Sequence, residues 1–323
     1  MRNLITGING FAASHLTNLL LENGEEVFGL GRNLENNQKT GSLSGKIKTF
    51  SCDMRDSAQL EKVISEISPK RIYHLASVSN PSEAAKDFKA AFEINALGTL
   101  NLFEAVKSNK ISPRIISVGS SQEYGFVGQE KMPISEEIAV KPMSPYGISK
   151  AYVGMLAQLF FFRDKLEVIH VRPFNHTGPG QAEKYVCSEF AKKIAEQELK
   201  ENPKIEVGNL RVERDFTDVR DTVQAYYSLM ASGEPGNAYN VCSGSLVSIK
   251  EILSILIKFA KREIVVVEKS EKFREGEQEK YYGKHGLLTQ QTGWEPKIPI
   301  KQTLSDLLDY WRRKIQVKKT YNH

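Results

Sequence analysis

The chain has 323 residues, of which 40% are hydrophobic and 26% charged, and its formal net charge is +5. This composition is typical of a folded globular protein and excludes disordered, collagen-like and small disulfide-stapled chains. The mild charge, without a basic tail, gives no support to nucleic-acid binding, and no window of about 18 apolar residues predicts a membrane span. The length suits one large α/β domain or two domains of roughly 150 residues.

The first half alternates short β-branched runs with helical patterns. Strands are predicted at Arg2–Thr6, Glu26–Leu30, Ile47–Ser51, Arg71–Leu75, Arg114–Gly119 and Leu166–Val171. Between them, apolar residues recur at intervals of three and four, which predicts helices that include Ala12–Glu22, Ser57–Ile67 and Phe88–Asn109. Strands that alternate with helices imply right-handed βαβ units, so we predict a Rossmann-type doubly wound parallel sheet over residues 1–172.

After Pro173 this alternation breaks up, with turns at Gly178–Gly180 and Gly233–Gly236. Two helices and one strand are predicted there, at Val186–Lys200, Ile300–Lys314 and Lys204–Val207. We expect residues 173–323 to form mainly a smaller α/β lobe that binds substrate. Because Ala238–Val241 also has strand character, segments near 210–245 are expected to return to the large sheet.

The three cysteines, Cys52, Cys187 and Cys242, lie far apart, with neither a CxxC pair nor a metal-ligand spacing. We therefore expect them to be reduced and buried, which favours a cytoplasmic location. The first predicted strand begins at Arg2, where a signal peptide would otherwise lie. No metal site is predicted.

The first strand leads into Thr6-Gly7-Ile8-Asn9-Gly10-Phe11-Ala12-Ala13, with small residues at positions 7, 10 and 13. Such residues permit a tight strand-to-helix turn, close approach of backbone N–H groups to a diphosphate, and close packing of the helix on the sheet. The diphosphate would lie at the helix N-terminus, where unpaired N–H groups favour an anion. An ordinary turn is the alternative, but the strand–turn–helix context favours dinucleotide binding.

The end of the second strand bears on which dinucleotide binds. In NAD-binding proteins a carboxylate about 20 residues further on accepts a hydrogen bond from the ribose 2′-hydroxyl. This chain has Leu30-Gly31-Arg32-Asn33 instead. The Arg32 guanidinium suits a 2′-phosphate, so NADP(H) is favoured; NAD(H) stays open, since Arg32 could also stack on adenine or remain solvated. Asp53 either accepts a hydrogen bond from the adenine amino group or caps the helix that follows.

The segment Ser144-Pro145-Tyr146-Gly147-Ile148-Ser149-Lys150 predicts a helix start with Ser144 as its cap and Pro145 in its first turn. Tyr146 and Lys150 then lie four residues apart on one face. We expect the lysine ammonium to lower the pKa of Tyr146 from its usual value near 10, which would make the phenol an effective acid. Ser120 follows a strand at the carboxyl edge of the sheet and can hold a carbonyl oxygen. A solvated surface pair is the alternative for Tyr146 and Lys150, and the order of the motifs argues against it.

Over nearly the whole chain, these motifs resemble those of the extended short-chain dehydrogenase/reductase family, in its nucleotide-sugar branch. The matching stretches are TGINGFAASHL at 6–16, HLAS at 74–77, SSQEYG at 120–125, YGISK at 146–150, RPFNHTGPGQ at 172–181, RDFTDVRD at 214–221 and GWEP at 293–296. The resemblance implies that Ser120, Tyr146 and Lys150 form a catalytic triad. It also implies cofactor contacts from Tyr146, Lys150, Gly7, Asn9, Gly10, Phe11, Ala12, Arg32, Asp53, Met54, Leu75, Ala76 and Ser77. Members typically form homodimers through two long helices, here Phe88–Asn109 and Tyr146–Arg163, the latter carrying Leu159-Phe160-Phe161-Phe162.

Dehydratases of this branch need a glutamate two positions after the catalytic hydroxyl to remove the C5 proton, and this chain has Gln122 there. An amide lacks the carboxylate for that task, and Glu123 would project to the opposite face of an extended segment. Dehydration is therefore not expected. Residues 172–181 resemble those of GDP-4-keto-6-deoxy-D-mannose reductases, which implies NADPH-dependent reduction of the C4 ketone to GDP-D-rhamnose.

By the same resemblance, Arg214 binds the diphosphate, and further substrate contacts come from Ser121, Gln122, Glu123, Asn175 and Arg274. Arg214 could instead form an ion pair with Asp215 or Asp218, and Arg274 could be a solvated loop charge. Glu123 could simply finish a strand. The stretch Tyr281-Tyr282-Gly283-Lys284 stands where many relatives carry an aspartate, which leaves the role of 270–285 open.

Other functions remain open at this point. One is an NAD-dependent nucleotide-sugar 4-epimerase or dehydratase, and another is a non-catalytic cofactor-sensing protein, against which the intact triad argues. The expected partners are a nucleotide-diphosphate sugar with a GDP group and a second copy of the chain, with neither nucleic acid nor membrane.

Overall fold

The computed structural model describes residues 1–32, 34, 45–268 and 278–321. Its largest element is a seven-stranded parallel sheet with the strand order β11-β6-β5-β4-β1-β2-β3. The strands are β1 (Arg2–Thr6), β2 (Glu26–Gly31), β3 (Lys48–Ser51), β4 (Arg71–His74), β5 (Arg114–Val118), β6 (Val168–Pro173) and β11 (Ala238–Val241). The predicted Rossmann-type sheet is confirmed.

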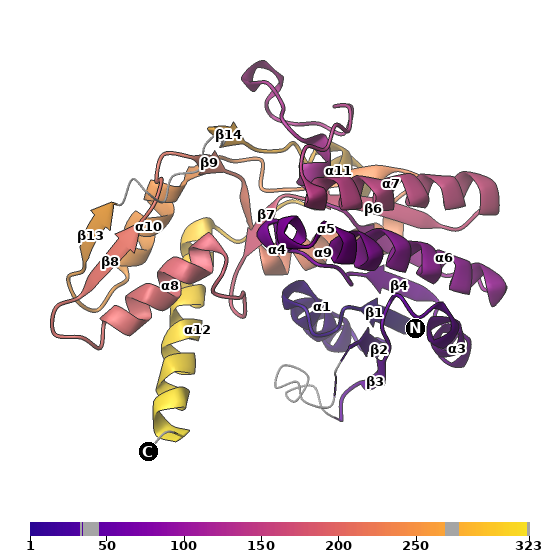
Figure 1. Ribbon diagram of the computed structural model, residues 1–323, viewed down its shortest axis with the longest axis horizontal. Helices are drawn as coiled ribbons and strands as arrows, with labels where there is room; N and C mark the ends of the chain where they lie inside the picture. The colour runs from indigo at the N-terminus through magenta and orange to yellow at the C-terminus, as the bar shows by residue number, and fades with distance from the viewer. Residues whose placement is uncertain (33, 35–44, 269–277, 322–323) are drawn as a thin grey trace.

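Helices cover both faces of this sheet (Figure 1). One face carries α3 (Ser57–Ile67), α6 (Gly98–Ser108) and α7 (Pro145–Asp164), which pack in that order. The other carries α1 (Phe11–Glu22), α9 (Val219–Ser232) and α11 (Gly286–Thr292). Because both faces are covered, the central strands are apolar almost throughout, and all six residues of β6 are buried.

The helix predicted over 88–109 is interrupted. It consists of α5 (Phe88–Phe92), a wide π-helical turn at Glu93–Leu97, and α6, and it follows the short α4 (Pro81–Lys86). Asn95, buried in the wide turn, accepts a hydrogen bond from the Val78 N–H and donates to Ser149 Oγ of α7. The apolar period is continuous across this turn, so periodicity alone could not detect it.

A second lobe has its own apolar core, in which Ile194, Ile252, Leu256, Leu304 and Trp311 are buried. It is built from α8 (Val186–Gln197), α10 (Ile249–Lys258), α12 (Ile300–Tyr321) and the parallel pair β8 (Lys204–Val207) and β13 (Val265–Glu268). In Figure 1 these elements gather on the left, away from α3, α6 and α7. Short strands make two small sheets beside it: β7 (Asn175–Thr177) with β10 (Phe216–Asp218), and β9 (Glu213–Arg214) with β12 (Val247–Ser248) and β14 (Lys280–Tyr281).

The chain passes between the two lobes more than once. After the second lobe begins, β11 pairs with β6, where Tyr239 lies opposite Val171. Val219 of α9 and Trp294 belong to the same apolar core as Ile5 of β1. We propose a lobe boundary at residues 172 and 173, with the later segments near 210–245 partly returning to the first lobe.

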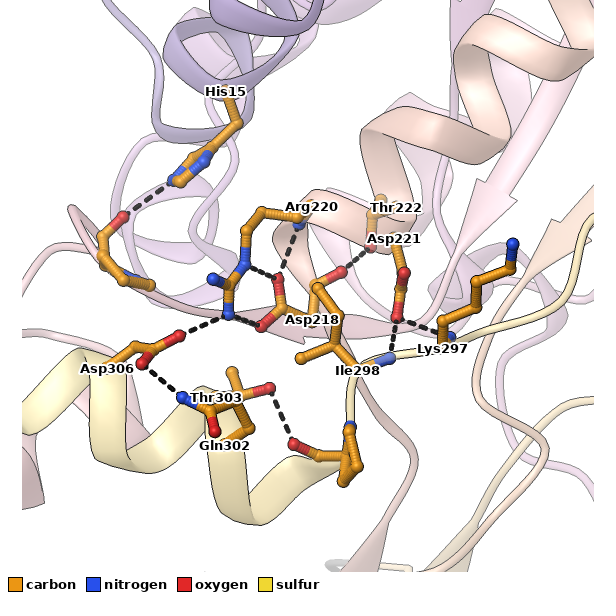
Figure 2. Close-up of polar contacts among 12 residues, drawn as sticks. His15, Asp218, Arg220, Asp221, Thr222, Lys297, Ile298, Gln302, Thr303 and Asp306 are labelled. Atoms are coloured by element: carbon orange, nitrogen blue, oxygen red, sulfur yellow. Dashed lines mark hydrogen bonds and ion pairs between the residues drawn. The ribbon is translucent and has the colours of Figure 1, made fainter.

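Charged contacts join the lobes where α9 begins (Figure 2). Arg220 donates to both carboxylate oxygens of Asp218, at 2.9 and 2.7 Å, and to Asp306 of α12 at 2.7 Å. Nearby, His15 of α1 donates to the carbonyl oxygen of Pro179 at 2.8 Å. The Arg220–Asp306 contact joins α9 to α12, and the His15–Pro179 contact joins α1 to the segment after β7. Together they fix the second lobe relative to the helices that cover the large sheet.

Cys52, Cys187 and Cys242 are buried and free. Within the described ranges, no helix has the length and apolarity that crossing a membrane requires. The same residues contain no group of three or more His, Cys, Asp and Glu side chains that could hold a metal ion.

Candidate active site

A cleft of 1460 Å³ lies between the two lobes, at the carboxyl ends of the sheet strands. Its walls include residues directly after β1, β2, β3, β4 and β5. Single-ligand pockets usually measure about 300–1,000 Å³, so this cleft has room for two ligands side by side. Open α/β sheets bind their ligands at this edge.

The cleft brings together almost all of the predicted site residues. Those that line it are Gly7, Asn9, Gly10, Phe11, Ala12, Arg32, Asp53, Met54, Leu75, Ala76, Ser77, Ser120, Ser121, Gln122, Tyr146, Lys150, Asn175 and Arg214. Glu123 is described and lies elsewhere, and Arg274 lies outside the described residues. Their individual roles remain predictions.

The glycine turn has the geometry that a diphosphate site needs. Gly7 has φ of +72°, and a Cβ there would lie 2.8 Å from the backbone Cα and N of Ala76, so a side chain is excluded by both conformation and space. Gly10 precedes the first turn of α1 and offers no side-chain cap. The N–H groups of that first turn have no partner within the helix, and Phe11 and Ala12 line the cleft.

Asn9 and Arg32 lie together where β2 ends. Asn9 Nδ2 donates to the Arg32 carbonyl at 2.9 Å, while Asn9 Oδ1 is buried and accepts no hydrogen bond from the described residues. A buried acceptor without a donor is costly, and a hydroxyl of a bound ribose would satisfy it. The side chain of Arg32 is 54% exposed and available to an anionic ligand.

Asp53 forms ion pairs with two arginines, Arg55 and Arg32, near the end of β2. It accepts from Arg55 Nη2 at 2.8 Å and lies 3.6 Å from Arg32 Nη1. Hydrogen bonding to Arg55, with a smaller contribution from Arg32, outweighs burial and lowers the pKa of Asp53 to about 2. Asp53 does not cap α3, because Asp56 accepts from the Gln59 N–H at 2.9 Å in that role.

The start of α7 is as predicted. Ser144 Oγ accepts from the Gly147 N–H at 3.0 Å, and Pro145 occupies the first turn. Tyr146 and Lys150 follow on the face toward the cleft, both buried. Lys150 Nζ donates to the Val118 carbonyl at 2.8 Å.

The prediction that Lys150 lowers the pKa of Tyr146 is wrong. Burial raises the pKa of Tyr146 well above 10, and a hydrogen bond with Ser120 offsets this only in part. Lys150 Nζ lies 6.0 Å from the centre of the tyrosine ring and is directed to the backbone of β5. Burial lowers the pKa of Lys150 itself to about 8. Tyr146 is therefore a neutral phenol at pH 7, the form that donates a proton.

The residues after Ser120 do not continue the strand as expected. Ser121–Tyr124 forms a 3₁₀ turn in which Ser120 Oγ accepts from the Gln122 N–H at 3.1 Å. Gln122 lines the cleft, and its Oε1 accepts from Ser144 Oγ at 3.3 Å. The predicted contact of Glu123 with the sugar is wrong, because its carboxylate is fully buried and pairs with His170 and Arg172 behind the turn.

Arg214 and Asn175 form part of the opposite wall. Arg214 Nη1 donates to the carbonyls of Glu213 and Glu279, at 2.9 and 3.1 Å. The carboxylates of Asp215 and Asp218 accept from Ser243 and Arg220 instead. Asn175 Nδ2 donates to the Asp215 carbonyl at 3.1 Å, which leaves its amide oxygen for a ligand.

Several residues of the cleft were not predicted. Tyr185 Oη and Ser79 Oγ are hydrogen-bonded at 3.2 Å across the two lobes, and Tyr281 Oη donates to the Ser121 carbonyl at 2.5 Å. Glu189 of α8 and residues 206–209, which include the end of β8 and the two residues after it, also line the cleft. The sequence carries no short motif at these positions, although Tyr281 lies in the stretch where this chain departs from its relatives.

Comparison with known proteins identifies the family. The sequence model of the GDP-mannose 4,6 dehydratase family matches residues 4–307. The chain belongs to this family. Membership in this family agrees with the resemblance to nucleotide-sugar enzymes that the motifs indicate.

Among relatives in this family, GDP-6-deoxy-D-mannose reductase of Pseudomonas aeruginosa is 38% identical over 77% of this chain and 82% of its own. GDP-mannose 4,6 dehydratase 2 of Caenorhabditis elegans is 27% identical over 94% of this chain and 87% of its own. The solved structure of RMD from Pseudomonas aeruginosa complexed with NADPH has a TM-score of 0.85 and 33% identity, over 97% of this chain and 99% of that one.

Proposed function

We propose that this protein is an NADPH-dependent reductase that converts the C4 ketone of GDP-4-keto-6-deoxy-D-mannose to the hydroxyl of GDP-D-rhamnose. The carbonyl-reducing triad of Ser120, Tyr146 and Lys150 lines the cleft. The reductase relative at 38% identity supports the same reaction class.

The observation that carries the proposal is the pair Gln122 and Glu123. A dehydratase needs a proton acceptor beside the triad, and the cleft has the Gln122 amide there, already hydrogen-bonded to Ser144. The neighbouring carboxylate, Glu123, is fully buried and points away from the cleft. An amide is not a base at neutral pH, which argues against dehydration although the family is named for it. Reduction and epimerisation remain, and the reductase relative supports reduction.

The triad residues have distinct tasks. Tyr146, kept neutral by burial, donates its proton to the C4 oxygen as negative charge develops there. Ser120 orients that oxygen through its hydroxyl. Lys150 binds the ribose next to the nicotinamide, and its hydrogen bond to the Val118 carbonyl links α7 to the end of β5.

The first wall of the cleft fits a phosphorylated dinucleotide. Gly7 and the first turn of α1 would hold the diphosphate, Asn9 Oδ1 would accept from a ribose hydroxyl, and Arg32 would pair with a 2′-phosphate. When bound, NADPH supplies the hydride. A reductase must exchange its cofactor after each turnover, and the NADPH in the similar solved structure supports this choice.

The second wall fits a GDP group. Arg214 is a cation of the cleft suited to a diphosphate. Two carboxylates also line this wall: Glu189, which pairs with Lys193 through one of its oxygens, and Glu206. Guanine presents two adjacent N–H donors, at N1 and N2, where uracil and thymine present a single one, and a carboxylate accepts two parallel hydrogen bonds.

A panel of substrates tests the function. The protein is mixed with NADPH and the 4-keto-6-deoxy sugars of GDP, dTDP and UDP, and absorbance of the reduced nicotinamide is followed. We expect loss of absorbance with the GDP sugar above all. Tightly held NAD in the purified protein, with exchange of 4-hydroxyl epimers and no need for NADPH, would identify an epimerase instead.

We also propose that the protein is a homodimer through the outer face of α7. Ile148, Tyr152, Met155, Leu159 and Phe162 are 36–66% exposed. They are spaced by four and three residues, so they form one apolar stripe along the helix. Such a stripe on a soluble protein is typical of an interface.

The run at 159–162 contributes only in part to this stripe, because Phe160 is fully buried in the core.

Light scattering after gel filtration tests the dimer. We expect Leu159→Glu to convert a dimer to a monomer, and Val265→Glu, at an equally apolar exposed site on β13, to leave it unchanged. A monomeric unmodified protein would refute the proposal.

Finally, we propose a cytoplasmic location. The three cysteines are buried thiols, the form that a reducing compartment maintains. Fractionation of cells tests this: the protein should accompany a cytoplasmic marker, and recovery with secreted proteins would contradict it.

A further inference from the structure

We propose that Glu123 is a positioning residue for Ser120. Its carboxylate, together with His170 and Arg172, forms a buried group that we call the carboxylate cluster. This role rests on the proposed ketone reduction, because fixing Ser120 matters for catalysis only if its hydroxyl orients the reacting oxygen.

A direct hydrogen bond joins Glu123 to the catalytic serine. Glu123 Oε1 accepts from the Ser120 N–H at 2.8 Å, and Ser120 Oγ accepts from the Gln122 N–H at 3.1 Å. This reciprocal arrangement is a capping box at the N-terminal end of the 3₁₀ turn. With its oxygen occupied by Gln122 as donor, the Ser120 hydroxyl can direct its own proton into the cleft.

The cluster holds the carboxylate in one place and in one charge state. Glu123 lies 3.0 and 3.1 Å from His170 Nε2 and accepts from Arg172 Nε at 2.9 Å, with only 1% of its side chain exposed. Burial alone would raise the pKa of Glu123, but His170, Arg172 and the Ser120 N–H together lower it. Arg172 is fixed in turn by Tyr124 Oη at 3.1 Å. The Glu123 carboxylate is thus paired on both oxygens, while His170 Nδ1, on the far side of the ring, is buried without a partner among the described residues. A buried carboxylate with several partners rigidifies the backbone it binds.

The cluster cannot act on a ligand directly. Its three residues line a separate cavity of about 150 Å³, which also touches Gly154 and Met155 of α7. A Cβ at Gly154 would lie 3.0 Å from His170 Nε2, and a Cβ at Gly119 would overlap Glu123 Oε1. The end of β5, which precedes Ser120, and α7, which carries Tyr146, therefore both pack directly against the cluster. The cluster can affect the reaction only by positioning Ser120.

A double-mutant cycle tests this role. Glu123→Gln preserves the volume of the side chain but places an NH₂ group where His170 and Arg172 need an acceptor. We expect kcat to fall about 30-fold while KM for the keto sugar stays within about 2-fold. In the Ser120→Ala background the same change should lower kcat by less than about 3-fold, since the residue through which Glu123 acts is already gone. Equal losses in the two backgrounds would overturn the proposal.

Two further variants separate positioning from general packing. Tyr239→Phe removes a buried hydroxyl that accepts from the Glu234 N–H and touches neither the carboxylate cluster nor Ser120, so kcat should stay within about 2-fold. A loss as large as that of Glu123→Gln would overturn the proposal. If Glu123→Gln does not fold, His170→Gln takes its place in the cycle, with a smaller loss that also disappears in the Ser120→Ala background.

Amide hydrogen exchange gives a readout that needs no turnover. We expect the Ser120 amide in folded Glu123→Gln to exchange at least about 10-fold faster than in the unmodified protein, because it has lost its acceptor's charge and geometry. Unchanged protection would overturn the positioning role. If the unmodified protein reduces none of the keto sugars, the proposed function fails, and the exchange rates still decide whether Glu123 fixes Ser120.

Discussion

The two walls of the cleft are built in different ways. On the sheet side, the lining residues follow directly after parallel strands, as Gly7 follows β1 and Arg32 follows β2. On the lobe side, they come from short strands and loops that meet only in the fold, as when β9 pairs with both β12 and β14. A parallel sheet collects its strand ends at one edge, whereas the second wall depends on contacts distant in sequence.

The largest expected effect lies on the sheet side. Tyr146→Phe removes the proton donor and should lower kcat about 10³-fold, while the affinity for NADPH stays within about 2-fold. Stopped-flow reduction and NADPH fluorescence titration measure the two quantities. An unchanged rate would show that Tyr146 is not the acid and that the proton donor does not lie on the sheet side of the cleft.

On the lobe side, Arg214→Ala should raise KM for the GDP keto sugar about 30-fold with kcat within about 3-fold, because a diphosphate partner is lost in ground and transition states alike. Arg211→Ala, three residues away, exposed and outside the cleft lining, is the matched control and should change neither constant. A fall in kcat alone would show that this wall contributes to the chemistry.

The cofactor end of the sheet wall should show a change of preference. Arg32→Ser should reduce the ratio of kcat/KM for NADPH over NADH about 20-fold, since the 2′-phosphate loses its cation. Arg55→Ser, which removes the other arginine on Asp53, should keep the ratio within about 2-fold. Equal changes in the two variants would mean that Arg32 acts only through Asp53.

The smallest effect concerns pH. Burial lowers the pKa of Lys150 to about 8, so the ammonium is present below pH 8 and lost above it, whereas Tyr146 remains protonated across that range. kcat/KM should therefore be level from pH 6 to 7 and decline about 10-fold from pH 7 to 9. Lys150→Arg should move the decline to higher pH, and a profile rising above pH 8 would contradict the assignment.

This contrast also explains what could be predicted from sequence. The turn at Gly7, the end of β2 at Arg32 and the helix start at Tyr146 each have a local signal, and the structure has them in one cleft. The predicted sugar contact of Glu123 was wrong because the turn after Ser120 is fixed by His170 and Arg172, nearly fifty residues further on. The effect of Lys150 on Tyr146 was misjudged for a related reason: burial, which spacing cannot report, decides the pKa. Tyr185 and Tyr281 lie in no recognisable sequence motif, and only the packing of the second lobe brings them into the cleft.

The most direct test of net reduction is the stoichiometry between cofactor and sugar. With GDP-4-keto-6-deoxy-D-mannose limiting and NADPH in excess, the protein should oxidise one NADPH for each keto sugar consumed, and GDP-D-rhamnose should be the product. Conversion of the sugar without net oxidation of NADPH would contradict this account and identify an epimerase or a dehydratase.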